Sequence, residues 1–284
     1  MKIKITADSV IDLSPEMLKE KDITLIPLFI TLGGTNYKDG VDVNPNDIYE
    51  FVEKNNQLPK TAAVSVDTFK AIFKKYVDEG YSVIHFDISS EMSASNSNAK
   101  IAAAEIGNVY VVDSRSLSSG VGLQVLYACD LVGKGLDAKT IYEKVLKRVN
   151  SVQASFIIDK LDYLYKGGRC SSLALLGANL LSIKPTIEVV GGKMIVGKKY
   201  MGSLKRALEK YVPDILTKYS NYDKSRIFIT HTKIDNDIIE KVRELIKQYA
   251  DFDEILETDA GCTITSHCGP GTLGILYYND KGEN

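Results

Sequence analysis

The pattern of apolar and polar positions divides the chain into two parts of different character. In the first part, short apolar runs predict buried strands near residues 2–6, 82–88 and 109–113. Amphipathic segments predict helices near residues 45–55, 66–79, 91–106, 117–133 and 137–149. This alternation is typical of a doubly wound parallel sheet. The segment 23–43 interrupts it and predicts a small β excursion that turns at Gly33 and Gly34.

The second part favours an α+β arrangement. Two strands joined at Gly191 and Gly192 are expected within residues 185–199, because this pattern is a hairpin signal. Further strands are expected near residues 226–231, 253–258 and 273–278, and helices near residues 161–167, 202–218 and 235–249. A hairpin with crossing helices indicates mixed or antiparallel pairing. We therefore expect an N-terminal α/β domain of residues 1–152 and a C-terminal α+β domain of residues 153–284.

Three of the predicted strands end in turns that are rich in hydroxyl groups. Five serines lie between positions 89 and 97 after the second of these strands. The other two turns contain Asp8, Ser9, Asp113, Ser114, Ser116, Ser118 and Ser119. Ligands of an open parallel sheet bind outside the carboxyl ends of its strands, and helix N-termini attract anions. The repetition therefore predicts a shared cleft for a carboxylate or phosphate, with ordinary helix capping as the alternative.

Composition narrows the class of protein. The 284 residues are 44% hydrophobic and 25% charged, as in a soluble globular protein, and a net charge of −2 disfavours nucleic-acid binding. No apolar run reaches the ~18 residues of a membrane span, and the charged N-terminus is expected to be a strand, so we expect a cytoplasmic protein. The four cysteines form no CxxC pair and match no zinc spacing, so free thiols and no metal or cofactor are expected.

Several basic side chains are expected on loops and at element ends, where they could bind an acidic group of a ligand. Residues 166–169 read Lys-Gly-Gly-Arg, so glycines are expected to end a helix and leave Arg169 on a loop. Lys184 comes just before a strand, and His267 is expected on a glycine-rich turn. Arg, Lys and His are the residues that bind carboxylates. A solvated arginine and a structural histidine are the alternatives, and His231 is the weaker candidate because its neighbours indicate a helix start.

Two glycine-rich motifs are better explained by turns than by nucleotide binding. Residues 269–274 match GxGxxG but precede the last strand, and residues 192–199 resemble a P-loop in which Lys199 replaces the hydroxyl residue.

A Ser-His-Asp hydrolase or transferase is the rival hypothesis for the serine cleft. Its best nucleophile candidates, Ser93 and Ser119, lack the GxSxG elbow. The sequence therefore favours binding over turnover.

A set of motifs in matching order from end to end resembles the DegV family of fatty-acid-binding proteins. The motifs are Asp8-Ser9 with Asp12-Leu13, Pro59-Lys60-Thr61 with Ser65 and Phe69, Ile88-Ser89-Ser90 with Ser93, Asp113-Ser114 with Ser119-Gly120, Leu161 and Leu164 with Gly167-Gly168-Arg169, Lys184-Pro185, and His267 to Gly271. The resemblance implies a two-domain α/β protein that is not itself an enzyme. It further implies one long-chain fatty acid buried between the domains.

The resemblance also implies which residues hold the carboxylate. Thr61, Ser93, Arg169 and His267 match the head-group positions of the family, and Ser119 and Arg206 complete the expected ligand-binding set. The protein sequence departs from the family pattern at Ala62-Ala63-Val64 and at Ala94. These departures affect the acyl-chain length and saturation expected of the ligand. The apolar stretches 23–30 and 173–181 are expected to line the tail tunnel. Some members present the bound acid to a separate kinase that forms an acyl phosphate, so a fatty acid kinase subunit is an expected partner.

Overall fold

The computed structural model describes residues 2–176 and 183–282. Its first sheet is entirely parallel and has the strand order β2-β1-β6-β7. The strands are β1 (Lys2–Asp8), β2 (Thr24–Ile26), β6 (Tyr81–Asp87) and β7 (Val109–Asp113). Strands of a parallel sheet are covered on both faces and are therefore rich in apolar residues. Strand β6 is an example, because it is buried at all positions except its first residue. The parallel sheet expected from the alternating pattern is confirmed.

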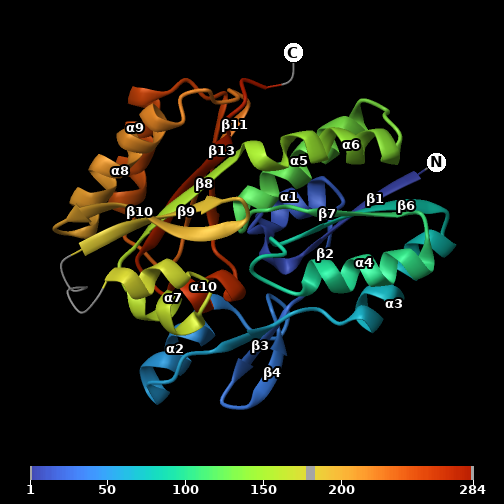
Figure 1. Cartoon of the computed structure of the whole chain (residues 1–284), viewed down its shortest axis with the longest axis horizontal. Helices are drawn as coiled ribbons and strands as arrows, with labels where there is room; N and C mark the ends of the chain where they lie inside the picture. The colour runs from blue at the N-terminus through green and yellow to red at the C-terminus, as the bar shows by residue number, and fades with distance from the viewer. Residues whose placement is uncertain (1, 177–182, 283–284) are drawn as a thin grey trace.

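Helices cover both faces of this sheet. On one face lie α3 (Val66–Asp78) and α4 (Ser95–Ile106), and on the other lie α5 (Ser119–Gly133) and α6 (Ala138–Arg148) (Figure 1). Eleven of the fifteen residues of α5 are buried, as expected for a helix that is apolar all round. Its outer face packs on the second sheet, so that Leu126 shares one core with Ile84 of β6 and Leu276 of the last strand. Helix α5 therefore belongs to the core of both halves of the molecule.

The second sheet has six strands in the order β10-β9-β8-β13-β11-β12. These are β8 (Val152–Ile158), β9 (Ile183–Val190), β10 (Lys193–Met201), β11 (Arg226–His231), β12 (Glu254–Asp259) and β13 (Thr272–Tyr278). Only the β11–β12 pair is parallel among the pairs of this sheet that the structure describes. Helices α8 (Leu204–Lys218) and α9 (Asn236–Tyr249) form an apolar core with it. The mixed α+β arrangement is confirmed, whereas the boundary near residue 152 stays a prediction.

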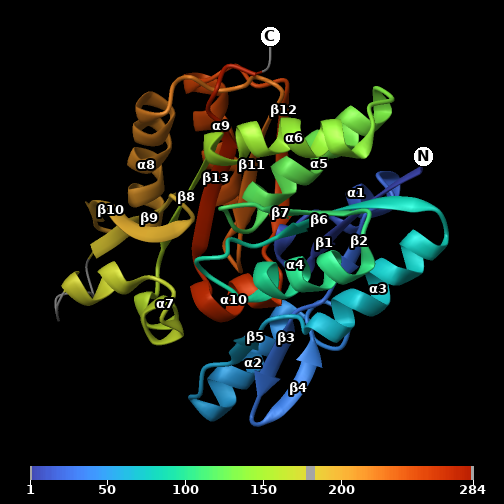
Figure 2. The same cartoon turned by 45° about the vertical axis from the view of Figure 1, so that its right-hand side comes forward.

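A third, antiparallel sheet lies below the first (Figure 2). Its order is β4-β3-β5, with β3 (Phe29–Leu32), β4 (Thr35–Lys38) and β5 (Lys60–Ala62), and α2 (Pro45–Asn55) lies beside it. The expected turn at Gly33 and Gly34 joins β3 to β4, and both residues have the positive φ that favours glycine. Strand β5 has no counterpart in the sequence prediction because three residues are too few for an apolar alternation.

Three short helices complete the fold: α1 (Pro15–Glu20), α7 (Leu161–Gly167) and α10 (Cys262–Cys268). Two expectations were wrong in detail. Helix α4 begins at Ser95 and not near residue 91, because Met92 and Ser93 donate their N–H groups to Ser89 O in a turn. His267 lies in helix α10 and not in a glycine-rich turn, which begins only at Gly269. Among the described residues, no helix is long and apolar enough to cross a membrane.

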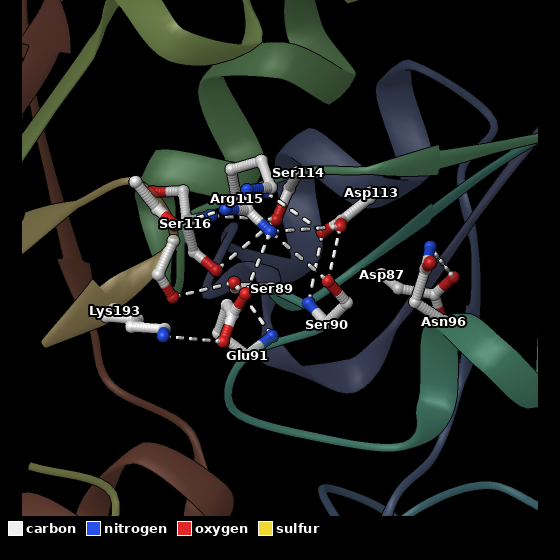
Figure 3. A network of polar contacts seen from close by, with 12 residues as sticks. Asp87, Ser89, Ser90, Glu91, Asn96, Asp113, Ser114, Arg115, Ser116 and Lys193 are labelled. Atoms are coloured by element: carbon white, nitrogen blue, oxygen red, sulfur yellow. Dashed lines mark hydrogen bonds and ion pairs between the residues drawn. The ribbon is translucent and has the colours of Figure 1, made fainter.

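The β9–β10 hairpin is fastened to the carboxyl ends of β6 and β7 by polar contacts (Figure 3). The Ser89 hydroxyl donates to Gly192 O at 2.7 Å, and the Arg115 guanidinium donates to Gly191 O. Lys193 forms an ion pair with Glu91 at 3.4 Å. We call these contacts of Ser89, Glu91 and Arg115 with residues 191–193 the hairpin latch. The serine-rich turns thus bind the second half of the chain at this point.

Candidate functional site

A cavity of about 50 Å³ lies where the three sheets meet α7 and α10. Its walls are largely apolar and come from both halves of the chain, with Leu28, Ile88, Met92, Leu117, Leu164 and Met194 among them. Four of the polar residues expected in the site, Thr61, Ser93, Arg169 and His267, also line it. Thr61 and His267, which are 206 positions apart in the sequence, therefore meet at one cavity.

Thr61 and His267 are in direct contact. The Thr61 hydroxyl lies 2.9 Å from His267 Nε2, and Thr61 is held in β5 by its pairing with Ile30. The other ring nitrogen, Nδ1, has no hydrogen-bond partner among the described residues. It faces Gly167, where even a single added methyl group would overlap it. The first glycine of the Gly-Gly-Arg motif is therefore required by the space that the imidazole ring occupies.

The electrostatic surroundings keep His267 neutral in the absence of a ligand. Burial of the ring, together with the positive charge of Arg169, lowers the pKa of His267 to about 4. A carboxylate that entered the cavity beside the ring would act in the opposite direction, because a negative charge favours the imidazolium. The site is therefore suited to an anion and disfavours a cation.

Arg169 connects the remaining polar groups. Gly168 ends α7 in the left-handed conformation, so Arg169 emerges on a loop, as the sequence predicts. Its Nη1 donates to Gly167 O at 2.9 Å, beside His267, and its Nε lies 3.5 Å from Met92 O, next to Ser93. The Ser93 hydroxyl accepts from Ser95 N at 3.2 Å at the start of α4. Arg169 is exposed, so the polar end of the cavity lies near the protein surface.

Two of the expected ligand-binding residues lie elsewhere. Ser119 is fully buried at the start of α5, where its hydroxyl contacts Thr230 of β11 and ties the two halves together. Arg206 is exposed in the first turn of α8, after the N-cap residue Ser203. Neither residue lines the cavity, so the structure does not bring them to the other four. The reason is that the Ser119 hydroxyl is directed at Thr230 of β11, whereas Arg206 is exposed to solvent.

The apolar part of the site continues past the first cavity. A second cavity of about 20 Å³ shares Leu117, Ile264 and Cys268 with the first, so these three residues separate the two spaces. Its other walls include Phe156, Ala260 and Leu276. Of the two apolar stretches expected to line a tunnel, 23–30 contributes Leu28 to the first cavity. Residues 177–182 of the other stretch lie outside the described part of the chain.

Sequence reasoning missed several wall residues. Thr263 and Ile264 come from α10, and Met92 and Met194 flank the hairpin latch. The two methionines follow directly on Glu91 and Lys193, which form an ion pair across the halves, but no sequence signal relates them. The departures from the family pattern fall on the site, because Ala62 and Ala63 line the cavity. Ala94 is exposed at the N-cap of α4.

The arrangement lacks the features of a serine hydrolase. His267 contacts a hydroxyl, but no carboxylate orients its Nδ1 within the described residues, and a pKa of about 4 makes it a weak base. A chain of contacts from Thr6 through His85 to Asp87 resembles a triad, but all three side chains are fully buried. No group of three or more His, Cys, Asp or Glu in the described ranges is arranged to hold a metal ion.

Comparison with known proteins assigns the fold to a family. A family model described as an uncharacterised protein of the DegV family matches residues 2–280. The chain belongs to the DegV family. A fatty acid-binding protein of Thermotoga maritima is 30% identical over 283 residues, which cover 97% of this chain and 97% of that protein. Members of the DegV family are named as fatty-acid-binding proteins rather than as enzymes.

Solved structures of DegV proteins have the same fold. A fatty-acid-binding DegV family protein from Thermus thermophilus superposes with a TM-score of 0.90 at 26% identity, covering 98% of this chain and all of that one (100%). DegV from Bacillus subtilis, described as a fatty acid binding protein, gives a TM-score of 0.86 at 26% identity, covering 99% of this chain and 100% of that chain. The α/β architecture expected from the DegV resemblance is therefore confirmed.

Proposed function

We propose that this protein binds a long-chain fatty acid, with the carboxylate at Thr61, Ser93, Arg169 and His267 and the tail in the apolar cavities. One observation carries the proposal: these four polar groups line one cavity whose other walls are largely apolar. Hydroxyl, imidazole and guanidinium groups are suitable donors to a carboxylate. The names of the DegV relatives, which describe fatty acid binding, support the same ligand class.

The tail supplies most of the binding energy in this proposal. Burial of each CH₂ group contributes about 0.8 kcal/mol, so a ~16–18-carbon chain has ample apolar surface to offset the cost of ordering it. The cavities of about 50 and 20 Å³ are too small for such a chain without movement of wall side chains. Met92 and Met194 are suited to this movement because methionine side chains adapt readily to a new shape.

Mass spectrometry of lipids extracted from the gently purified protein tests the proposal. We expect to recover a fatty acid in about equal amount to the protein. Titration of the delipidated protein with that fatty acid should restore the complex. Repeated extraction of nothing, together with no binding in the titration, would overturn the proposal. Hydrolysis of a simple ester that requires Ser93 or His267 would instead support the serine-dependent hydrolase or transferase.

We further propose that the bound acid is presented to a separate fatty acid kinase. The support is positional: Arg169 and Ala62 are exposed beside the polar end of the cavity, so a partner could approach the carboxylate. In such a reaction a carboxylate oxygen attacks the γ-phosphorus of ATP, and ADP leaves as the acyl phosphate forms. Hydroxylamine converts acyl phosphates to hydroxamates, so the loaded protein with the kinase and ATP should yield a fatty acyl hydroxamate. Its absence, with a kinase that acts on another DegV protein, would exclude this role.

A further inference from the structure

Helix α10 carries His267, but it has no means of capping its own first turn. Its N-cap residue is Gly261, which has no side chain, and no side-chain cap comes from within the helix. The helix has only seven residues and contains several β-branched ones, Thr263, Ile264 and Thr265, which lower helix propensity. Free N–H groups at a buried helix start are costly, so another part of the chain must accept their hydrogen bonds.

Two aspartates from the first half of the chain supply these acceptors. Asp12 Oδ1 accepts from Gly261 N at 2.9 Å, and Asp39 Oδ1 accepts from Cys262 N at 3.1 Å. Asp39 Oδ2 accepts from Thr263 N at 3.3 Å and from the Thr263 hydroxyl at 2.6 Å. Three consecutive N–H groups are therefore bound by two carboxylates that lie more than 220 positions away in the sequence.

Both aspartates are themselves held in place. Asp39 is 4% exposed and Asp12 is 7% exposed. The Ser9 hydroxyl donates to Asp39 Oδ2 at 2.9 Å, and the Ser118 hydroxyl donates to Asp12. Ser9 also accepts from the N–H of Leu28, a wall residue of the cavity. The two carboxylates are thus rigid parts of the first half, and they act on the helix of the second half.

We propose that Asp39 and Asp12 are positioning residues of the head-group site, which hold α10 so that His267 meets Thr61. Neither carboxylate lines the cavity, so their effect on a ligand runs through the helix. The contact between His267 and Thr61 joins the same two halves one and a half helical turns further along α10. Release of the first turn would let the helix shift and separate the imidazole from the Thr61 hydroxyl.

The proposal rests on fatty acid binding as the function, and a double-mutant cycle tests it. The affinity for the fluorescent fatty acid cis-parinaric acid is measured for wild type and Asp39→Asn, each also in a His267→Ala background. We expect Asp39→Asn to weaken binding by about tenfold in the wild-type background, as for one charged hydrogen bond, and to have little effect when His267 is absent. An equal loss in both backgrounds, or no loss in either, would overturn the proposal.

A control and a second variant keep the result interpretable. Asp137 caps α6 through the N–H groups of Lys139 and Thr140 and does not line the cavity, so Asp137→Asn should leave binding unchanged. If Asp39→Asn does not fold, Asp12→Ala takes its place in the same cycle with Asp39 intact. If Asp137→Asn and the test variant lose affinity to the same extent, the proposal is also overturned.

A measurement without ligand separates this proposal from the proposed function. The chain has three histidines, so the ring resonances of His267 can be assigned by comparison with His267→Gln. Asp39→Asn should shift these resonances in the ligand-free protein and leave those of His85 unchanged. Failure of wild type to bind cis-parinaric acid would remove the fatty acid function, whereas unshifted His267 resonances would remove only the positioning role.

Discussion

His267 Nε2 and the Thr61 hydroxyl lie 2.9 Å apart, and this contact joins a helix of the second half to a strand of the first. The strand β5 has only three residues and the helix α10 only seven. Each element is too short to be stable alone, so the polar end of the cavity depends on tertiary contacts.

The pKa of His267 predicts how the stability of the ligand-free protein varies with pH. Burial lowers the pKa to about 4, below the ordinary value of 6.5, so folding favours the neutral ring. The stabilisation is therefore present above pH 6.5 and is lost as the pH falls toward 4. Its size is on the order of 3–4 kcal/mol, from ~1.4 kcal/mol per pKa unit over the shift from 6.5 to about 4. Urea unfolding at about pH 7.5, above this window, and at about pH 4.5, near its lower end, should show a smaller difference in stability for His267→Gln than for wild type.

Gly167→Ala should weaken ligand binding without unfolding the protein. Residue 167 lies at the end of α7 without a positive φ, so alanine suits the backbone, but its methyl group would overlap His267 Nδ1. The matched control is Gly168→Ala, where the methyl group meets nothing within 4 Å but φ is +69°. The control should cost about 1 kcal/mol of stability and leave affinity nearly unchanged. Equal affinities of the two variants in a fatty acid titration would contradict the expectation.

The hairpin latch predicts a difference between two adjacent glycines. Both Gly191 and Gly192 have positive φ, so alanine strains the backbone at either position. Only at Gly192 would the added methyl group lie 2.6 Å from Ser89 Oγ and 2.9 Å from the Arg115 guanidinium. Gly192→Ala should therefore destabilise the protein by about 1–2 kcal/mol more than Gly191→Ala, because it also breaks latch hydrogen bonds. Denaturant midpoints of the two variants measure this difference, and equal midpoints would refute it.

Asp12 predicts a pH effect of opposite sign to that of His267. Burial, opposed by its bonds to Ser118 and Gly261, raises the pKa of Asp12 from 3.8 to about 7. A raised carboxyl pKa contributes stability that is fully present below pH 3.8 and is lost as the pH rises through 7. Asp12→Asn imitates the protonated acid, so its stability relative to wild type should be greater at pH 8 than at pH 5. The same relative stability at both pH values would count against a raised pKa.

Ser93→Ala should reduce affinity for a fatty acid and leave the melting temperature nearly unchanged. A hydroxyl that donates to a carboxylate contributes about 1.5–3 kcal/mol, whereas its present contact with Ser95 N is a neutral hydrogen bond of the half-buried turn before α4. Ser119→Ala is the matched comparison, because Ser119 lies outside the cavity and contacts Thr230 instead. Loss of stability rather than affinity is expected for Ser119→Ala. Calorimetry and a binding titration on the same samples distinguish the two.

The sequence predicts the parallel sheet and the hairpin because their apolar runs and glycine turns are local signals. The glycine cap that leaves Arg169 on a loop was predicted for the same reason. In contrast, the sequence predicts a turn at His267 because Gly269, Pro270 and Gly271 follow it closely, whereas the structure places it in α10. Asp12 and Asp39 accept hydrogen bonds from the first N–H groups of this helix, and the sequence gives no sign of this long-range contact.

The site residues divide in the same way. Thr61, Ser93, Arg169 and His267 follow from the motifs shared with the DegV family, and the structure brings them to one cavity. The same motifs gave no reason to separate Ser93 from Ser119, since both serines follow a strand. Only the packing of α5 between the sheets shows that Ser119 faces β11 and not the cavity.

Helix α5 has a consequence for how the molecule unfolds. Its side chains share one continuous core with strands of both sheets, so neither half can separate without exposing it to water. Arg148, stacked between Tyr127 and Tyr278 and paired with Asp223 and Asp280, reinforces this junction at the far end. We therefore expect the two halves to unfold together, in one cooperative transition. A hinge that opened the halves like a clamshell would have to break this core, so a ligand must enter by local movement of the cavity wall.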